Sequence, residues 1–129
     1  MSNELQNEST SFNDHIRTRT KQASLRVIRL YQQLPRTGEA TVLGKQLLRS
    51  ATSVAANFRA ACPGRSAAEW YAKLCICVEE ADETLFWLEL LGDAGILSKA
   101  RLSELEQEYL ELVSLLASTR KKAKANLDK

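Results

Sequence analysis

Apolar side chains recur at alternating steps of three and four residues along four separate stretches of the chain. Such steps place residues on one face of an α-helix, whereas a half-buried strand alternates at every second residue. In the first stretch the repeating residues are Ile16, Thr20, Ala23, Val27, Leu30 and Leu34. A polar and basic stripe runs beside them, so the sequence predicts an amphipathic helix that begins near Ser11, with Asp14 three residues later as its capping partner.

Three further helices are predicted over about residues 39–62, 66–92 and 98–120. Residues that favour helix ends separate them, and these are Pro35 and Gly38, Pro63 and Gly64, and Gly92 and Gly95. Ser66 and Glu69 form a Ser-x-x-Glu capping box at the start of the third helix. Ser98 begins the fourth, which is expected to fray after Arg120.

Each of these helices has its own stripe for a core. In the second helix the stripe consists of Leu43, Leu47, Ala51, Val54, Phe58 and Ala61. In the third helix it consists of Ala67, Tyr71, Leu74, Val78, Ala81, Leu85 and Leu88. In the fourth helix it consists of Leu102, Leu105, Tyr109, Leu112, Leu116 and Thr119. Long helices with short connections predict an all-α protein, an antiparallel up-down-up-down four-helix bundle over residues 12–120. Residues 1–11 are then a flexible N-terminal segment and residues 121–129 a basic polar tail.

Composition fits one cytoplasmic domain. At 129 residues and 44% hydrophobic content, the chain is long enough to bury a core. The polar start has no apolar region, so no signal peptide is expected, and no stretch reaches the length of a membrane span. Three cysteines are an odd number without the spacing of a disulfide framework, which suits a reducing compartment.

Charge is distributed unevenly along the chain. Residues 15–68 carry a net charge of +9, and residues 69–119 carry −8. The favoured interpretation is that the two halves pair with each other inside the molecule, and the alternative is a basic face for an anionic partner. Glu80 and Glu83 share a helix face, and we expect them to bind Arg49, Arg59 or the amide of Asn57.

The stretch SATSVAANFRAAC, residues 50–62, has Arg59 as its only charge. Small residues let helices approach closely, and a helix surface without charge is typical of a face that another subunit covers. Close packing inside one chain explains part of the stretch, and Trp87 and Leu90 of the third helix, which lie away from its core stripe, favour an oligomer. The predicted interface consists of Arg49, Ser53, Ala56, Asn57, Arg59, Ala60, Ile76, Glu80, Glu83, Trp87 and Leu90.

No catalytic or metal-binding pattern stands out. His15 is the only histidine and has no identifiable nucleophile or orienting partner near it in sequence. Cys75 and Cys77 point to different sides of a helix and cannot share a metal ion. The acidic cluster of residues 79–83 lacks the histidine that a di-iron bundle would need. We therefore expect no enzyme activity, no cofactor and no metal.

Basic residues on the first helix and the tail can follow a phosphate backbone, although no aromatic platform accompanies them. The residues considered for RNA or DNA binding are Arg17, Arg19, Lys21, Arg26, Arg29, Lys121, Lys122 and Lys124. The alternative is a protein-binding adaptor whose basic residues serve only internal ion pairs. Steep salt dependence of binding to nucleic acid would separate these two functions.

The sequence also resembles a known family. The resemblance covers about residues 12–120 and rests on QLLRSATSVAANFRAA and on RSAAEWYAKLCICVEEADETLFWLELLGDAGIL. These stretches are similar to the four-helix-bundle proteins associated with intervening sequences in bacterial 23S rRNA genes. The resemblance implies a cytosolic bacterial protein that forms a ring-shaped homopentamer. A relative in that family, the accessory protein of diversity-generating retroelements, is a basic pentameric barrel that binds nucleic acid and a reverse transcriptase. A non-enzymatic oligomeric binding or scaffold protein is therefore the expected function.

Overall fold

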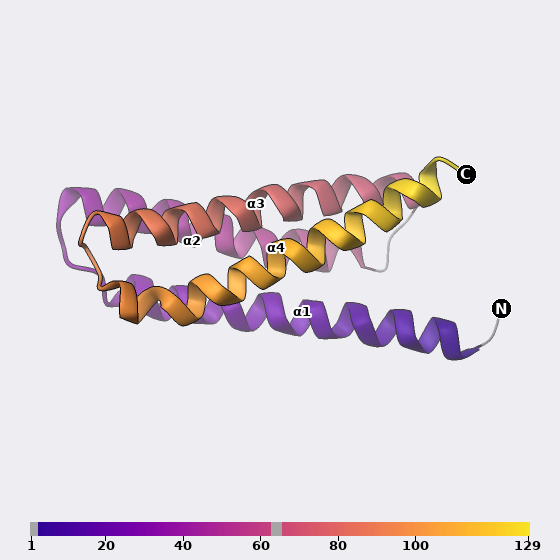
Figure 1. The fold of residues 1–129 in the computed structure, drawn as a ribbon, viewed down its shortest axis with the longest axis horizontal. Helices are drawn as coiled ribbons and strands as arrows, with labels where there is room; N and C mark the ends of the chain where they lie inside the picture. The colour runs from indigo at the N-terminus through magenta and orange to yellow at the C-terminus, as the bar shows by residue number, and fades with distance from the viewer. Residues whose placement is uncertain (1–2, 63–65) are drawn as a thin grey trace.

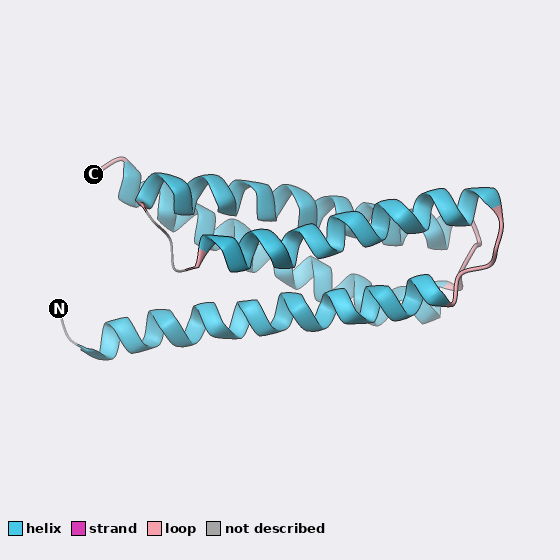
Figure 2. Cartoon of the chain, turned by 180° about the vertical axis from the view of Figure 1, so that it is seen from behind, coloured by secondary structure: helices cyan, strands magenta, loops and turns pink. Residues whose placement is uncertain are grey.

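The computed structural model describes the backbone of residues 3–62 and 66–129 and the side chains from Ser11 onward, apart from that same gap (Figure 1). It contains α1 (Asn3–Gln32), α2 (Gly38–Ala61), α3 (Ala67–Asp93) and α4 (Lys99–Leu127). Within these two ranges the chain forms helices and turns and no strand (Figure 2). The all-α class and the four helices are thus confirmed.

Side chains cap three of the helices at their N-terminal ends. The Thr37 hydroxyl accepts a hydrogen bond from the backbone N–H of Ala40, and Ser98 caps α4 in the same way. At α3 the Ser66 hydroxyl accepts from the backbone N–H of Glu69 at 3.0 Å. These contacts satisfy N–H groups that have no partner inside the helix, and they confirm the predicted starts at Ser66 and Ser98. The predicted helix break at Pro63 and Gly64 lies outside the described residues.

Two predicted helix ends are wrong. Helix α1 begins at Asn3 instead of near Ser11, so Ser11 is an interior residue and not an N-cap. Helix α4 continues to Leu127 instead of fraying after Arg120. Both differences have the same cause, because neither stretch contains a proline or glycine and both are rich in residues that tolerate a helix well. Ala123 is also buried, which anchors the last turns of α4.

Helices that are consecutive in the chain pack side by side. Helix α3 packs closely against both α2 and α4, and α1 lies mainly against α2 with few approaches to α4. The α1–α2 and α3–α4 connections lie at one end, and the start of α1 and the end of α4 both lie at the other end (Figure 1). The bundle is therefore closely packed between α2 and α3 and between α3 and α4, and it is more open between α1 and α4.

The buried residues confirm the predicted core stripes of α1, α2 and α4 almost entirely. Helix α3 is rotated relative to the prediction, and its buried residues are Leu74, Cys77, Ala81, Thr84, Leu88, Leu91 and Gly92. Tyr71, Val78 and Leu85 are only half-buried, and Ala67 is exposed. The difference arises because α3 packs closely against both α2 and α4, and the side of the helix that lies between these two neighbours is the side that is buried. No helix among the described residues has the length and apolar character to cross a membrane.

Candidate interaction surfaces

The small residues of α2 first serve packing within the chain. On one side of α2 the Ser24 hydroxyl of α1 lies 3.1 Å from the carbonyl oxygen of Ala51. On the other side the hydroxyl oxygens of Ser50 and Thr84 are 2.8 Å apart, and both side chains are fully buried. Larger side chains at Ser50 or Ala51 would push α1 or α3 away. Close internal packing therefore accounts for the inward part of residues 50–62.

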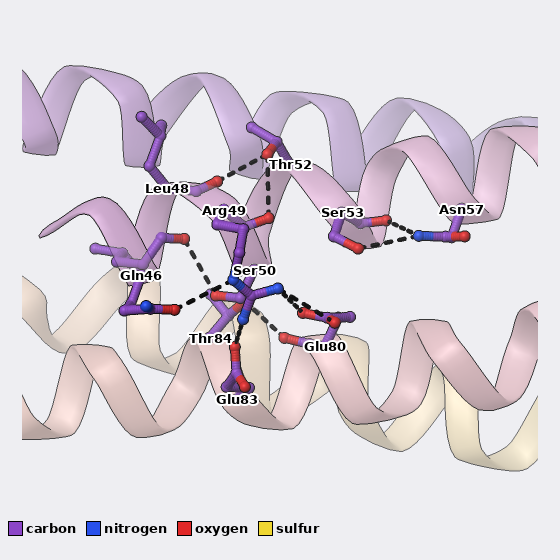
Figure 3. A network of polar contacts seen from close by, with 11 residues as sticks. Gln46, Leu48, Arg49, Ser50, Thr52, Ser53, Asn57, Glu80, Glu83 and Thr84 are labelled. Atoms are coloured by element: carbon purple, nitrogen blue, oxygen red, sulfur yellow. Dashed lines mark hydrogen bonds and ion pairs between the residues drawn. The ribbon is translucent and has the colours of Figure 1, made fainter. Parts of the chain in front are cut away.

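A network of polar contacts joins α2 to α3 on the outside of the bundle (Figure 3). Arg49 donates to Glu80 at 3.1 Å through Nη1, and it also pairs with Glu83. Its Nε donates to Gln46 of the same helix at 3.2 Å. The predicted ion pairs of Glu80 and Glu83 with Arg49 are thus present in the structure.

The other partners suggested for these carboxylates lie elsewhere. The amide nitrogen of Asn57 donates within α2, to the carbonyl oxygen of Ser53 at 2.9 Å and to its hydroxyl at 3.0 Å (Figure 3). Arg59 is on the side of α2 that faces α1, where it lines a groove. Arg59 therefore does not belong to the surface that α2 and α3 share.

The remaining predicted interface residues form two rows. On α2, Ala56 and Ala60 are exposed beside half-buried Ser53. On α3, Ile76, Glu80, Glu83, Trp87 and Leu90 follow steps of four and three, which places them on one face. Ile76 is 37% exposed, and the indole N–H of Trp87 has no hydrogen-bond acceptor among the described residues. These rows are the outer α2–α3 face, and its coverage by another subunit remains a prediction.

Ion pairs connect α1 to α4, where few backbone contacts exist. Arg19 binds Glu108 through two hydrogen bonds, Nε to Oε2 at 2.9 Å and Nη2 to Oε1 at 2.7 Å, and it lies 3.4 Å from Glu111. Hydrogen bonding to Glu108 raises the pKa of Arg19, although burial acts in the opposite direction. A weaker contact of 3.9 Å joins Arg26 to Glu104. Arg19 and Arg26 of the predicted nucleic-acid surface are therefore engaged within the chain.

The other basic residues considered for nucleic acid are divided between two regions. Arg17 pairs with Asp14 at 3.6 Å, and Lys124 pairs with Asp128 and lies over the ring of Tyr71. Exposed basic residues with no ion pair among the described side chains are Lys21, Arg29, Lys121 and Lys122. Because Lys21 faces the α1–α2 side and the lysines lie at the end of α4, the structure does not gather them into one basic face.

A groove of about 740 Å³ lies between α1 and α2, and residue patterns alone did not predict it. Its apolar lining is Leu25, Ile28, Ala55 and Ala56. Three cations, Arg17, Lys21 and Arg59, line it as well. The only sequence signal for it is the four-residue spacing of Arg17, Lys21 and Leu25, which puts them in one row of α1. Ala56 and Arg59, two predicted interface residues, belong to this groove.

The described residues include no group of three or more His, Cys, Asp or Glu side chains that could hold a metal ion, and His15 is exposed. The three cysteines are free thiols. Burial raises the pKa of Cys77 to about 12 and also raises that of Cys62, so both thiols are held in the neutral, unreactive form.

The chain is thus an all-α protein of four packed helices, with ion pairs between α1 and α4 and between α2 and α3. The chain belongs to the 23S rRNA-intervening sequence protein family, whose model matches residues 13–118. A crystal structure of a protein of unknown function from the S23 ribosomal protein family of Bacteroides thetaiotaomicron is similar, with 32% identity and a TM-score of 0.78. The similarity covers 84% of this chain and 97% of that chain. The comparison with curated proteins finds no match.

Proposed function

We propose that this chain is a non-enzymatic scaffold protein, an antiparallel up-down-up-down bundle that assembles into a homopentamer through α2 and α3. The observation that carries the proposal is the outer α2–α3 face, where Ser53, Ala56 and Ala60 of α2 present no charge to solvent. An outward helix face normally carries Lys and Glu, and its replacement by small residues favours close approach of a second chain.

Features of α3 support the same surface. Ile76 is 37% exposed on it, and Trp87 and Leu90 are half-buried beside it. Apolar and aromatic side chains on a helix surface are typical of interfaces that another chain covers. The number five is what the family resemblance implies. The antiparallel order is supported by the ion pairs, since Arg26 pairs with Glu104 and Arg19 with Glu108.

Substitution of Ala60 tests this surface, because Ala60 is exposed and does not line the α1–α2 groove. Ala60→Glu places a carboxylate on the outer face of α2, and we expect it to reduce the solution mass to one chain of 14.4 kDa. Ala100→Glu is the matched control, because Ala100 is exposed near the start of α4, away from this face. An Ala60→Glu variant with the mass of the unmodified protein would reject the outer α2–α3 face as the interface.

The ion pairs favour protein over nucleic acid as the further partner of the scaffold. Arg19 and Arg26 of the predicted basic stripe are bound to carboxylates of α4, which leaves fewer cations for phosphate. The net charge of the chain is only +2. The free thiols are consistent with a reducing cytoplasm as the place of action. A protein-binding scaffold is therefore our proposal, and RNA or DNA binding through α1 and the end of α4 is the alternative.

Retention on immobilised RNA and duplex DNA at increasing salt separates the two partners. A protein that contacts several phosphates loses affinity steeply as salt rises. We expect weak retention that is unchanged by Lys121→Glu/Lys122→Glu. Strong retention with a steep salt dependence, lost in that variant, would establish nucleic-acid binding instead.

A further inference from the structure

The groove between α1 and α2 and the outer side of α3 are complementary. The groove has cations and an apolar wall, and α3 presents carboxylates and an exposed phenyl ring. We infer that the α1–α2 groove of one copy receives α3 of a second copy, with Phe86 in its apolar part and Asp82 and Glu79 facing its cations. This inference rests on the proposed self-association and names the two surfaces that meet.

The groove has an apolar part and a basic part. The hydrogen bond between Ser24 and the carbonyl of Ala51 sets the register of α1 on α2. Leu25 and Ile28 follow Ser24 and are half-buried, and they form the apolar wall together with Ala55. Lys21 lies one turn before Leu25, and Arg59 lies one turn after Ala55, so the cations gather toward one end. Both of these cations are exposed.

The surface of α3 that is complementary to the α1–α2 groove is centred on Phe86. Phe86 is 50% exposed, which is unusual for a phenyl ring on a helix surface. Asp82 lies four residues before it, Glu79 seven residues before it and Glu89 three residues after it, so all three share its face. These carboxylates are exposed, and in the described part of the chain none of the three belongs to an ion pair. The surface made by Glu79, Asp82, Phe86 and Glu89 is the acidic α3 face.

The charged residues of α3 and of α1 lie at similar distances along the helix from an apolar residue. On α3, Asp82 and Glu79 lie one and two turns from Phe86; on α1, Lys21 and Arg17 lie one and two turns from Leu25. When Phe86 packs over Leu25, Asp82 therefore reaches Lys21, and Glu79 reaches Arg17. Arg59 approaches the same carboxylates from the opposite wall. The contact buries an exposed phenyl ring and pairs charges that have no strong partner in the isolated chain.

Because the groove and the acidic α3 face are different surfaces of one chain, the contact is head-to-tail. Each copy in a pair keeps one free groove and one free face, so association continues until a ring closes. Helix α3 lies on the other side of α2 from α1 in its own chain, since it packs against α2 and α4 (Figure 1). The groove is therefore filled from another copy.

Two complementary variants test the contact. The groove variant Lys21→Glu/Arg59→Glu and the face variant Glu79→Lys/Asp82→Lys change only exposed side chains, and circular dichroism should show unchanged helicity. We expect light scattering to give one chain of 14.4 kDa for each variant alone. An equimolar mixture should form a particle of two chains and no larger, because it contains only one intact groove and one intact face per pair. The chain with all four reversals should regain the mass of the unmodified protein.

Controls separate this inference from the proposed function. Lys121→Glu/Lys122→Glu changes the charge as much as the groove variant does and should leave the mass unchanged. Phe86→Ala, which alters no charge, should also weaken the assembly. If the unmodified protein is an oligomer and both charge variants keep its mass, the inference is wrong and self-association stands. If the unmodified protein is a monomer, the proposed function itself fails. A groove variant that keeps its mass and loses retention on RNA would assign the groove to nucleic acid.

Discussion

The guanidinium group of Arg19 on α1 binds the carboxylate of Glu108 on α4 through two hydrogen bonds, of 2.9 and 2.7 Å. Both side chains are more than three-quarters buried, with 22% and 17% of their surfaces exposed. Helix α1 makes few other approaches to α4. This pair is therefore the main polar link that holds α1 against the far side of the bundle.

Removing that link should lower stability. We expect Arg19→Ala to reduce the free energy of unfolding by about 1–3 kcal/mol, because it leaves a partly buried carboxylate without its charged donor. Urea unfolding followed by circular dichroism measures the effect. Arg26→Ala is the matched control, since its partner Glu104 is 92% exposed at 3.9 Å and should contribute almost nothing. Equal losses in the two variants would contradict a special role for Arg19.

Gly44 sets the distance between α1 and α2. A Cβ atom at this position would lie 2.5 Å from Cδ1 of Leu34 and 3.0 Å from the ring of Tyr31. Gly44→Ala should therefore destabilise the protein by about 1–3 kcal/mol, although alanine favours a helix. Gly38→Ala is the control, because a Cβ there meets nothing within 4 Å and the substitution should be neutral or slightly stabilising. Thermal unfolding of the two variants compares them, and a stabilised Gly44→Ala would show that α1 can shift.

The buried hydroxyl pair of Ser50 and Thr84 should behave as a unit. Their oxygens are 2.8 Å apart, and each also lies near a carbonyl oxygen of its own helix. Ser50→Ala and Thr84→Val should each cost about 1 kcal/mol, since each leaves a buried polar partner less satisfied. The double variant should cost less than the sum by at least about 0.5 kcal/mol. Strict additivity in urea unfolding would contradict a direct interaction.

Alkaline pH should destabilise the fold through two buried groups. Burial, more than the neighbouring Cys62, raises the pKa of Cys77 from 9.0 to about 12, and burial likewise raises the pKa of Tyr109. In the unfolded chain both groups ionise at lower pH. The stability that Cys77 provides is therefore complete below about pH 9 and is lost between about pH 9 and about pH 12, and the stability that Tyr109 provides is lost only above about pH 10. Within its own range, each group lowers the free energy of unfolding by up to about 1.4 kcal/mol per pH unit.

The urea midpoint measured at several pH values tests this dependence. Cys77→Ala lacks the thiol, so its stability should fall less steeply above pH 9 than that of the unmodified protein. This difference in slope is expected even if the variant is less stable at neutral pH. Parallel curves for the two proteins would mean that Cys77 does not cause the loss.

Sequence periodicity predicted the helices and most of the core because each helix keeps its apolar residues at helical spacing. Ile16, Val27 and Leu30 of α1 are buried as expected. The ends of α1 and α4 were wrong because no proline or glycine marks them and packing at Ala123 extends the last helix. The ion pairs of Arg49 with Glu80 and Glu83 were predictable from opposite charges on adjacent helices.

The groove was not predictable in the same way. Periodicity shows which face of a helix is buried, but not how closely two neighbouring helices approach. The groove depends on the position of α1, which follows from local contacts such as Gly44 against Leu34 and Ser24 against Ala51. The ion pair of Glu108 with Arg19 was not predicted for the same reason, since the spacing within each helix does not show which side chains of α1 and α4 meet.

Self-association is the central claim, and the solution mass by light scattering at low and at high salt tests it most directly. We predict a particle of five chains at low salt that persists at high salt, because apolar packing of Phe86 and of the small residues of α2 is not screened. A mass of 14.4 kDa, one chain, at both salt concentrations would contradict the account. The small residues of α2 would then serve internal packing alone.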